Sequence, residues 1–275
     1  MPSQLPKLRI VDAAAVSTTA AGVIAGTLAA AIAERGAAHW ATTGGSAAPG
    51  FYRALVAEPL RSRVRWDAVH TWWGDDRFVP FDHPLSNVLP FEEILMGPTG
   101  IDAGQTSYLA ETAPQREVGI AIPRANLHRW PIGAAIAGAE GPGWAAARYA
   151  DELRAVAPSD PTGTPVLDLV VLGVGPDGHV LSVFPGSAVW DEPSSCAGVP
   201  APTHVEPHVE RVTMHPRVIA AARTVLVVTS GSAKAPVLAR AWTGDDLREL
   251  PVRAARLPTA TWVVDEAAAA ALPRE

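Results

Sequence analysis

One histidine stands where a general base is expected, in a glycine-rich loop that follows an apolar segment. The loop, residues 173–186, comes directly after the apolar run 167–172 and contains Asp177, Gly178 and His179. Imidazole is the usual general base near neutral pH, and a carboxylate two residues away can orient it. We therefore interpret His179 as a candidate base and Asp177 as its partner. The alternative for an isolated histidine is a structural hydrogen bond.

The same loop matches the G-x-G-x-x-G pattern of dinucleotide sites, but two features oppose that interpretation. The third glycine should open a long helix, yet Pro185 and Gly186 interrupt the chain soon afterwards. No acid follows at the end of a second strand about 20 residues further on. We interpret the glycines as a close backbone approach to a smaller ligand.

Two carboxylates and an arginine follow another apolar segment, residues 69–73. Arg77 could hold an oxyanion with two guanidinium nitrogens, or it could balance the charges of Asp75 and Asp76. Taken alone, a surface salt-bridge cluster is the better interpretation of these three residues.

Two further loops between a strand and a helix are suited to a phosphate group. Gly44 and Gly45 allow backbone N–H groups to approach an anion, and Ser46 adds a hydroxyl. An ordinary tight turn explains this motif equally well. Lys234 lies at the start of another helix, where the helix dipole disfavours a cation. Since Lys7 and Lys234 are the only lysines among 22 basic residues, we favour a specific anionic partner for Lys234 over the alternative of a solvated side chain.

Composition excludes several classes of protein. A net charge of −6 over 275 residues argues against a broad nucleic-acid surface, although not against a local basic pocket. The single cysteine, Cys196, excludes an internal disulfide framework and a zinc site of four cysteines. His204 and His208 have acids nearby, but prolines prevent one helix from presenting both rings, so we interpret them as loop and strand surface and expect no metal.

Residues 13–33 are rich in alanine and nearly uncharged, so they require a membrane check. Alanine contributes little to bilayer insertion, and the segment also contains hydroxyl side chains. We expect a helix of a soluble, cytoplasmic protein.

The elements that must position the candidate residues alternate between strand and helix patterns. This alternation predicts an α/β fold with a mostly parallel sheet, whose ligands lie beyond the carboxyl ends of the strands. The expected strands are 8–11, 39–42, 69–73, 167–172, 224–229 and 261–264. The expected helices are 13–35, 49–56, 88–95, 144–156, 216–222, 234–242 and 265–272. We expect a single domain over 1–275, with a small subdomain or covering loop in 97–142 and a surface loop at 187–207.

Together, these segments resemble the glucosamine-6-phosphate isomerase/6-phosphogluconolactonase family, and within it the 6-phosphogluconolactonases. The matching segments come in family order and span most of the chain: 44–46, 73–80 with Ser86-Asn87, 167–186, 211–213 and 230–235. The most specific is Asp177-Gly178-His179, followed by residues 182–185.

The resemblance implies a modified Rossmann-like, three-layer fold and a carboxylic ester hydrolase. The implied reaction is hydrolysis of 6-phospho-D-glucono-1,5-lactone to 6-phospho-D-gluconate, the second step of the oxidative pentose phosphate pathway. It also implies no metal and no organic cofactor. We expect a small phosphorylated sugar lactone as the partner, no nucleic acid or membrane, and a monomer or weak homodimer.

Roles for individual residues follow from the same resemblance. His179 looks like the base that activates water, with Asp177 orienting it, and Arg77 would face the lactone oxygens. Asp75 matches an acid that the deaminase relatives use for proton transfer. The implied substrate- and phosphate-binding set is Gly44, Gly45, Ser46, Asn87, Arg211 and Lys234.

Two other functions compete with lactone hydrolysis. An amino-sugar phosphate isomerase or deaminase typically has Asn-Glu where this chain has Pro185-Gly186, and Asp-Glu-Tyr where it has Asp75-Asp76-Arg77. Both differences favour the lactonase. A non-catalytic sugar-phosphate sensor is opposed only by the retained base and acids.

Overall fold

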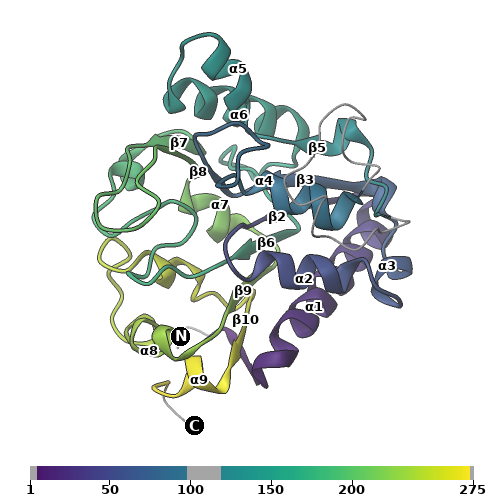
Figure 1. Ribbon diagram of the computed structural model, residues 1–275, viewed down its shortest axis with the longest axis vertical. Coiled ribbons are helices and arrows are strands. Elements are labelled where there is room, and N and C mark those ends of the chain that lie inside the picture. Colours follow the sequence, from purple (N-terminus) through teal and green to yellow (C-terminus); the bar gives the residue numbers. More distant parts are fainter. Residues whose placement is uncertain (1–4, 98–118, 273–275) are drawn as a thin grey trace.

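The centre of the protein is a sheet of parallel strands (Figure 1). The structure is a computed structural model and describes residues 5–97 and 119–272. Seven strands pair in the order β1-β10-β9-β6-β2-β3-β5, and every pair is parallel. Their bounds are β1 Lys7–Val11, β2 Ala38–Thr42, β3 Val69–Trp73, β5 Leu127–His128, β6 Leu169–Leu172, β9 Val225–Thr229 and β10 Ala260–Asp265.

This arrangement confirms the α/β fold with a mostly parallel sheet. All strands predicted from the sequence are present, with bounds shifted by no more than two residues. The pattern does not predict β5, because two residues are too few to carry a periodicity. β5 lies inside the region 97–142, where it extends the main sheet. Residues 98–118 of that region lie outside the described residues.

Helices cover both faces of the sheet and make three layers. The connections run in both directions along the sheet, so right-handed crossovers place helices on either side. α1 packs on β2, β6, β9 and β10 and against α2, while α6 contacts the β3 side through Tyr149. The helix bounds are α1 Val16–Arg35, α2 Ala48–Leu55, α3 Leu60–Arg63, α4 Val88–Pro90, α5 Ile132–Ala137, α6 Pro142–Val156, α7 Pro216–Ala221, α8 Ala235–Trp242 and α9 Glu266–Ala269. α4 continues into a π-helical run, Phe91–Met96, which overlaps the predicted helix 88–95 and ends one residue beyond it.

The apolar segment at the N-terminal end of the chain is a core helix in this fold. Ala13–Arg35 is long and apolar enough, by length and composition, to span a membrane. In the structure, α1 inserts Ala20, Ala21, Ile24 and Leu28 into the core with no exposed surface. Its packing therefore accounts for its apolar character.

A second sheet lies beside the carboxyl ends of the main strands. It contains β4 Asp75–Arg77, β8 Arg211–Met214 and β7 Cys196–Val199, paired antiparallel in that order. The prediction of a surface loop at 187–207 is wrong for β7. Position 198 requires glycine, because a Cβ there would lie 2.6 Å from the backbone nitrogen of Gly143 in α6. This glycine interrupts the apolar pattern of β7. Close packing of a helix on this strand therefore conceals it from pattern analysis.

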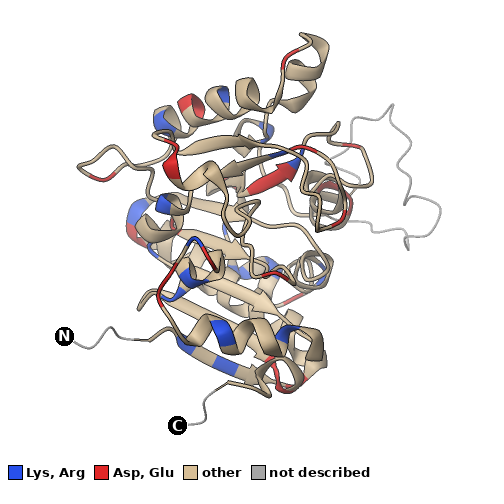
Figure 2. Cartoon of the chain, turned by 90° about the vertical axis from the view of Figure 1, so that its left-hand side faces the viewer, with Lys and Arg blue, Asp and Glu red and all other residues tan. Residues whose placement is uncertain are grey.

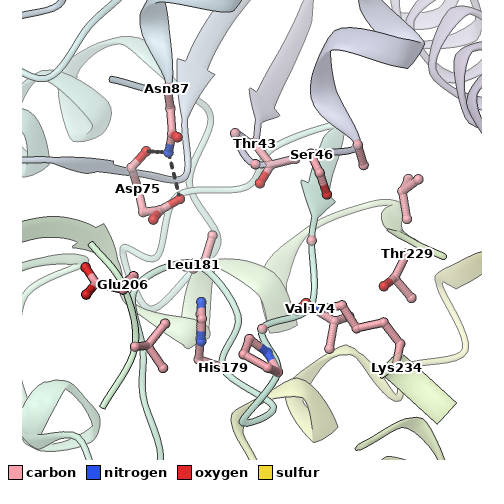
Figure 3. A pocket seen from close by; sticks show the side chains of 18 of the residues that line it. Thr43, Ser46, Asp75, Asn87, Val174, His179, Leu181, Glu206, Thr229 and Lys234 are labelled. Carbon is pink, nitrogen blue, oxygen red and sulfur yellow. Dashed lines mark hydrogen bonds between the residues drawn. The ribbon is translucent and has the colours of Figure 1, made fainter. Parts of the chain in front are cut away.

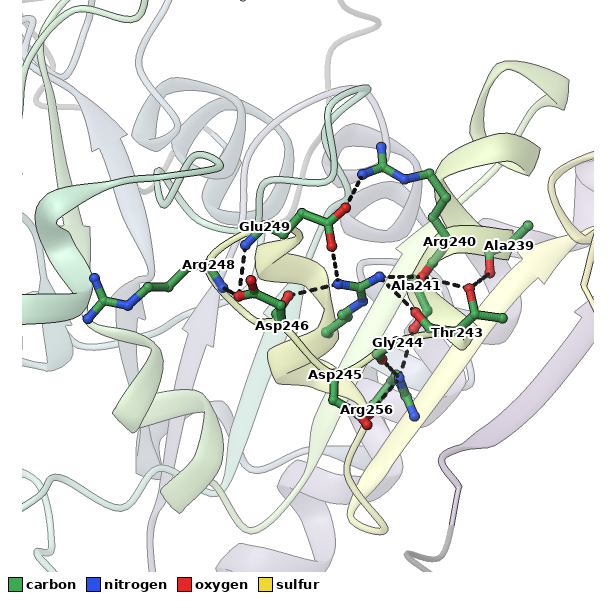
Figure 4. A network of polar contacts seen from close by, with 11 residues as sticks. Ala239, Arg240, Ala241, Thr243, Gly244, Asp245, Asp246, Arg248, Glu249 and Arg256 are labelled. Atoms are coloured by element: carbon green, nitrogen blue, oxygen red, sulfur yellow. Dashed lines mark hydrogen bonds and ion pairs between the residues drawn. The ribbon is translucent and has the colours of Figure 1, made fainter.

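A buried arginine, Arg253, holds the loop that follows α8. That loop contacts the segment 173–186, which contains His179. Arg253 donates to the carbonyl oxygens of Thr243 and Asp246 at 2.8 Å each, and to the carboxylate of Glu249 at 2.9 Å. Figure 4 shows these polar groups of the loop converging. The same loop reaches the histidine segment, because the backbone N–H of Val252 donates to the carbonyl of Gly178 at 2.9 Å.

We expect Arg253→Ala to lower the free energy of unfolding by about 3 kcal/mol, because it leaves buried carbonyl groups without a donor. Arg240 is the matched control. It binds the same Glu249, but its side chain is 55% exposed. Arg240→Ala should therefore change stability little. Urea unfolding of both variants measures the difference, and equal losses would contradict a special role for the buried arginine.

Two buried histidines should make stability fall as the pH falls. Burial, helped by the charge of Arg217, lowers the pKa of His215 to about 4, and burial lowers that of His39 to about 4. An unfolded histidine titrates near 6.5, so between about pH 6.5 and 4 the unfolded chain binds more protons than the native one. Stability is therefore full above pH 6.5 and is lost progressively below it.

His215→Asn isolates one of these groups. The Nδ1 atom of His215 accepts the N–H of Arg217 at 2.9 Å and caps α7. Asparagine keeps the capping acceptor but does not titrate. We expect the free energy of unfolding of His215→Asn to differ little from that of the wild type at pH 7.5. Between pH 6.5 and 4.5 the variant should lose about 2 kcal/mol less stability than the wild type. Unfolding curves with an unchanged pH slope would contradict this assignment.

Candidate active site

A polar pocket of about 400 Å³ lies at the carboxyl ends of β2, β3, β6 and β9. Nine of the predicted site residues line it: Gly44, Gly45, Ser46, Asp75, Arg77, Asn87, His179, Arg211 and Lys234. In Figure 3, Asp75 and Asn87 lie at one end, Thr229 and Lys234 lie at the other, and His179 lies between them. Segments far apart in the sequence thus meet at the sheet edge that the strand pattern indicates.

His179 lines the pocket, and Asp177, the one predicted site residue that does not line it, is hydrogen-bonded to His179. The Nδ1 atom of His179 lies 2.6 Å from Oδ1 of Asp177, and the same oxygen accepts the backbone N–H of His179 at 3.1 Å. Because an ionised carboxylate only accepts, Nδ1 carries the proton and Nε2 of the neutral ring is free to act as a base. The second oxygen, Oδ2, contacts Nε2 of His204 at 3.0 Å.

Asp177 is held in its ionised form. Burial by itself would raise its pKa, but the hydrogen bond and charge of His179 and the contact with His204 outweigh burial and lower it well below the usual range. A carboxylate that stays ionised can stabilise an imidazolium as it forms. The pair is therefore suited to general-base catalysis.

The glycines of this loop give the histidine its place. A Cβ on Gly175 would lie 2.0 Å from Nδ1 of His179, so the ring occupies space that only glycine leaves open. Gly178 has φ +88°, in the left-handed region. A turn and a bridge between Val180 and Val183 follow it. A turn in place of a long helix argues against a dinucleotide site. The glycine at position 175 is needed to make room for the His179 ring, in addition to the predicted approach of a ligand.

Asp75 is a buried carboxylate at one end of the pocket. Its Oδ2 atom accepts the hydroxyl of Ser182 at 2.6 Å, and the amide of Asn87 donates to its backbone oxygen at 2.9 Å. A Cβ on Gly44 would lie 1.8 Å from Oδ1 of Asn87, so this glycine admits the asparagine. Gly44 and Asn87 thus support Asp75 in addition to lining the pocket.

Asp76 organises the loop beneath the pocket. It is 1% exposed and accepts the N–H groups of Arg77 and Asn87 at 2.8 and 2.7 Å and the hydroxyl of Ser86 at 3.0 Å. Burial raises its pKa to about 7, although the hydrogen bonds from Asn87 and Arg77 oppose that change. The surface salt-bridge interpretation of Asp75, Asp76 and Arg77 is therefore wrong, because both carboxylates are buried.

Two arginines lie opposite each other where β4 pairs with β8. Arg77 is the partner of Arg211 in the strand register, and it donates from Nη1 to the carbonyl of Leu85 at 2.7 Å. Arg211 donates to the carbonyls of Val209 and Pro207 at 3.2 and 2.8 Å. Burial, together with the charge of Arg77, lowers the pKa of Arg211. Arg211 therefore holds the chain before β8 as well as lining the pocket.

The other end of the pocket offers cationic, hydroxyl and backbone N–H groups. Lys234 ends a 3-10 turn directly before α8, and its Nζ atom donates to the carbonyl of Val174 at 2.7 Å. Burial lowers its pKa, while the charge of Asp177 opposes that change. Ser46 lies in the turn that leads into α2, after Gly45 with φ +77°.

Sequence reasoning missed several residues of the pocket. Thr43, Thr229 and Ser230 line it with hydroxyls, and Glu206 contributes a carboxylate. The signal that could have found the first three is their position, because each ends or follows a predicted strand. Within residues 5–97 and 119–272, no group of three or more His, Cys, Asp or Glu side chains is placed to hold a metal ion.

Comparison with known proteins agrees with this fold. The family described as glucosamine-6-phosphate isomerases/6-phosphogluconolactonase matches residues 11–264. A 6-phosphogluconolactonase of Streptomyces coelicolor is 32% identical over 248 residues, which cover 88% of this chain and 85% of that protein. The solved 6-phosphogluconolactonase from Trypanosoma cruzi is 24% identical, with a TM-score of 0.79 over 100% of both chains. That from Leishmania guyanensis is 25% identical, with a TM-score of 0.77 over 98% of this chain and 100% of that one. Since the family match spans most of its length, the chain belongs to the glucosamine-6-phosphate isomerase/6-phosphogluconolactonase family.

Proposed function

We propose that this protein is a 6-phosphogluconolactonase, which hydrolyses 6-phospho-D-glucono-1,5-lactone to 6-phospho-D-gluconate. The observation that carries the proposal is His179, hydrogen-bonded to Asp177, in a pocket that also holds Lys234 and Ser46 at one end and the buried carboxylate of Asp75 at the other. Its family membership and the names of its relatives support the same reaction.

Water is the nucleophile in the proposed mechanism. Nε2 of His179 takes a proton from a water molecule as its oxygen attacks the lactone carbonyl. Negative charge develops on the carbonyl oxygen, and Arg77 faces it from β4. When the tetrahedral intermediate collapses, the bond to the ring oxygen breaks and the imidazolium returns its proton to that oxygen. Asp177 holds the ring in the required tautomer throughout.

The phosphate is proposed to bind at the opposite end of the pocket. Lys234, Ser46 and Thr229 supply a charge and two hydroxyls there, and the turn before α2 supplies backbone N–H groups. Figure 2 shows basic and acidic residues interspersed along the chain. Since the net charge is −6, an anionic substrate must be captured by this local site and not by the overall field.

Asp75 is proposed to accept hydrogen bonds from substrate hydroxyls. Its Oδ2 atom accepts a hydrogen bond from Ser182, and its backbone oxygen accepts one from the amide of Asn87. The carboxylate is therefore held in place before the substrate binds. Such preorganisation orients the sugar ring relative to His179.

The remaining expectations form part of the same proposal. We infer a single domain over 1–275 that acts in the cytoplasm, in the oxidative pentose phosphate pathway, as a monomer or weak homodimer without metal or organic cofactor. A continuous hydrophobic core around the main sheet supports the single domain.

His179→Ala tests the base directly. With the phospholactone generated in situ and acid release followed above the spontaneous rate, we expect kcat to fall by about 10²–10⁴-fold because no group takes the proton from water. Asp177→Asn should also be strongly impaired, because an amide does not enforce the tautomer. If the wild-type protein gives no acceleration, the proposed function is wrong. If His179→Ala keeps full activity, only the assignment of the base is wrong. Ammonia release from glucosamine-6-phosphate would instead indicate the deaminase.

Lys234→Ala tests the phosphate end. Because the phosphate is remote from the reacting carbonyl, its contacts act similarly on substrate and transition state. We expect KM to rise at least about 10-fold, while kcat changes by less than about 3-fold. Lys7→Ala is the matched control, since Lys7 is the other lysine and is exposed on β1. An unchanged KM in Lys234→Ala would count against this lysine as a phosphate ligand.

A further inference from the structure

A second histidine contacts the carboxylate that orients the proposed base. Oδ1 of Asp177 binds His179, and Oδ2 lies 3.0 Å from Nε2 of His204, so the carboxylate is held between two imidazole rings. Both rings also contact Phe184, with ring centroids 4.7 Å away for His179 and 5.7 Å away for His204. The side chain of His179 is 17% exposed and that of His204 is 52% exposed, so the second ring lies on the solvent side.

We propose that His204 is a positioning residue of the active site, which acts through Asp177 to fix and moderate the base His179. An ionised carboxylate only accepts hydrogen bonds, so Nε2 of His204 is the donor in this contact. A second donor fixes the plane of the carboxylate. It also withdraws charge from the oxygen that faces His179. His204 therefore holds the base in place and limits its basicity. The effect of His204 on the reaction rate rests on the proposed function, whereas its effect on Asp177 and His179 does not.

The chain that follows His204 is anchored at the pocket. After this stretch, Arg211 of β8 donates to the carbonyls of Pro207 and Val209 at 2.8 and 3.2 Å. Val205, the next residue after His204, lines the pocket. The contact between His204 and Asp177 therefore lies next to an anchored segment of the pocket wall, and neither of these two residues itself lines the pocket.

Other charged groups also act on the pair. Lys234, on the turn before α8, interacts electrostatically with Asp177. Arg211 of β8 lies 5.9 Å from the ring centre of Phe184, and Glu206 lies on the pocket wall. All three remain when His204 is replaced, so a change on replacement reports the contact of His204 itself.

His204→Ala should move the acid limb of the kcat/KM profile to higher pH by about 0.5–1 unit, because Asp177 regains the charge that His204 withdrew. The plateau value of kcat should fall by about 3–10-fold, since the carboxylate is less firmly oriented. His204→Gln keeps a neutral N–H donor, so it should restore most of kcat and return the limb towards its wild-type position. A structural role alone would not produce this pattern.

The ring signals of His179, followed by NMR against pH in the free protein, give a readout that needs no turnover. Their midpoint should rise in His204→Ala. His208→Ala is the matched control, because His208 lies in the same stretch and its ring contacts Pro202 and Glu206 instead of Asp177. An unchanged midpoint in His204→Ala, or an equal shift in His208→Ala, would overturn the proposal. Absence of lactonase activity in the wild type, with the midpoint shifted, would overturn the proposed function alone.

Discussion

The hydrogen bond between Asp177 and His179 is the contact on which the rest of the site depends. It closes over only two residues, so the chain must turn sharply between them, and Gly178 supplies the left-handed conformation for that turn. The ring then lies against Gly175, where any side chain would collide with it. The position of the His179 ring therefore requires glycine at both 175 and 178.

That turn is supported from several parts of the chain. The backbone of Val252 holds Gly178 from behind, and the loop that contains Val252 is held in turn by the buried guanidinium of Arg253. Phe184 packs against the imidazole, and His204 reaches the carboxylate of Asp177 from the solvent side. An imidazole ring held from several directions would lose little freedom on binding of a substrate, which favours the proposed role of His179 as a base.

Buried carboxylates are the second constraint on the architecture. Asp75 and Asp76 lie at a sheet edge with almost no access to water, so each needs donors from the protein. Ser86 and backbone N–H groups supply them to Asp76 and tie β4 to the segment before α4, while Ser182 supplies one to Asp75 and ties β4 to the loop of His179. The small antiparallel sheet then places Arg77 and Arg211 side by side at the same end of the pocket.

The periodic strands and helices of the main fold followed from the sequence, because burial on both faces leaves continuous apolar runs such as residues 167–172. β5, β7 and the small sheet did not follow. They are short, and β7 contains Gly198, where a side chain would collide with the backbone of α6. Short strands are determined by partners distant in sequence, which a local pattern does not reveal.

The sequence by itself determined which residue types stand at the strand ends, and hence the candidate base, its adjacent acid, the arginines and the phosphate loops. The tertiary structure alone decided which of them meet. It placed His204 on Asp177 and buried Asp76 beneath the site, and it made Gly44 a support for Asn87. Adjacent residues such as Asp177 and His179 interact through local geometry and can be recognised in sequence. A contact across 27 residues, as between Asp177 and His204, depends on how the intervening chain packs.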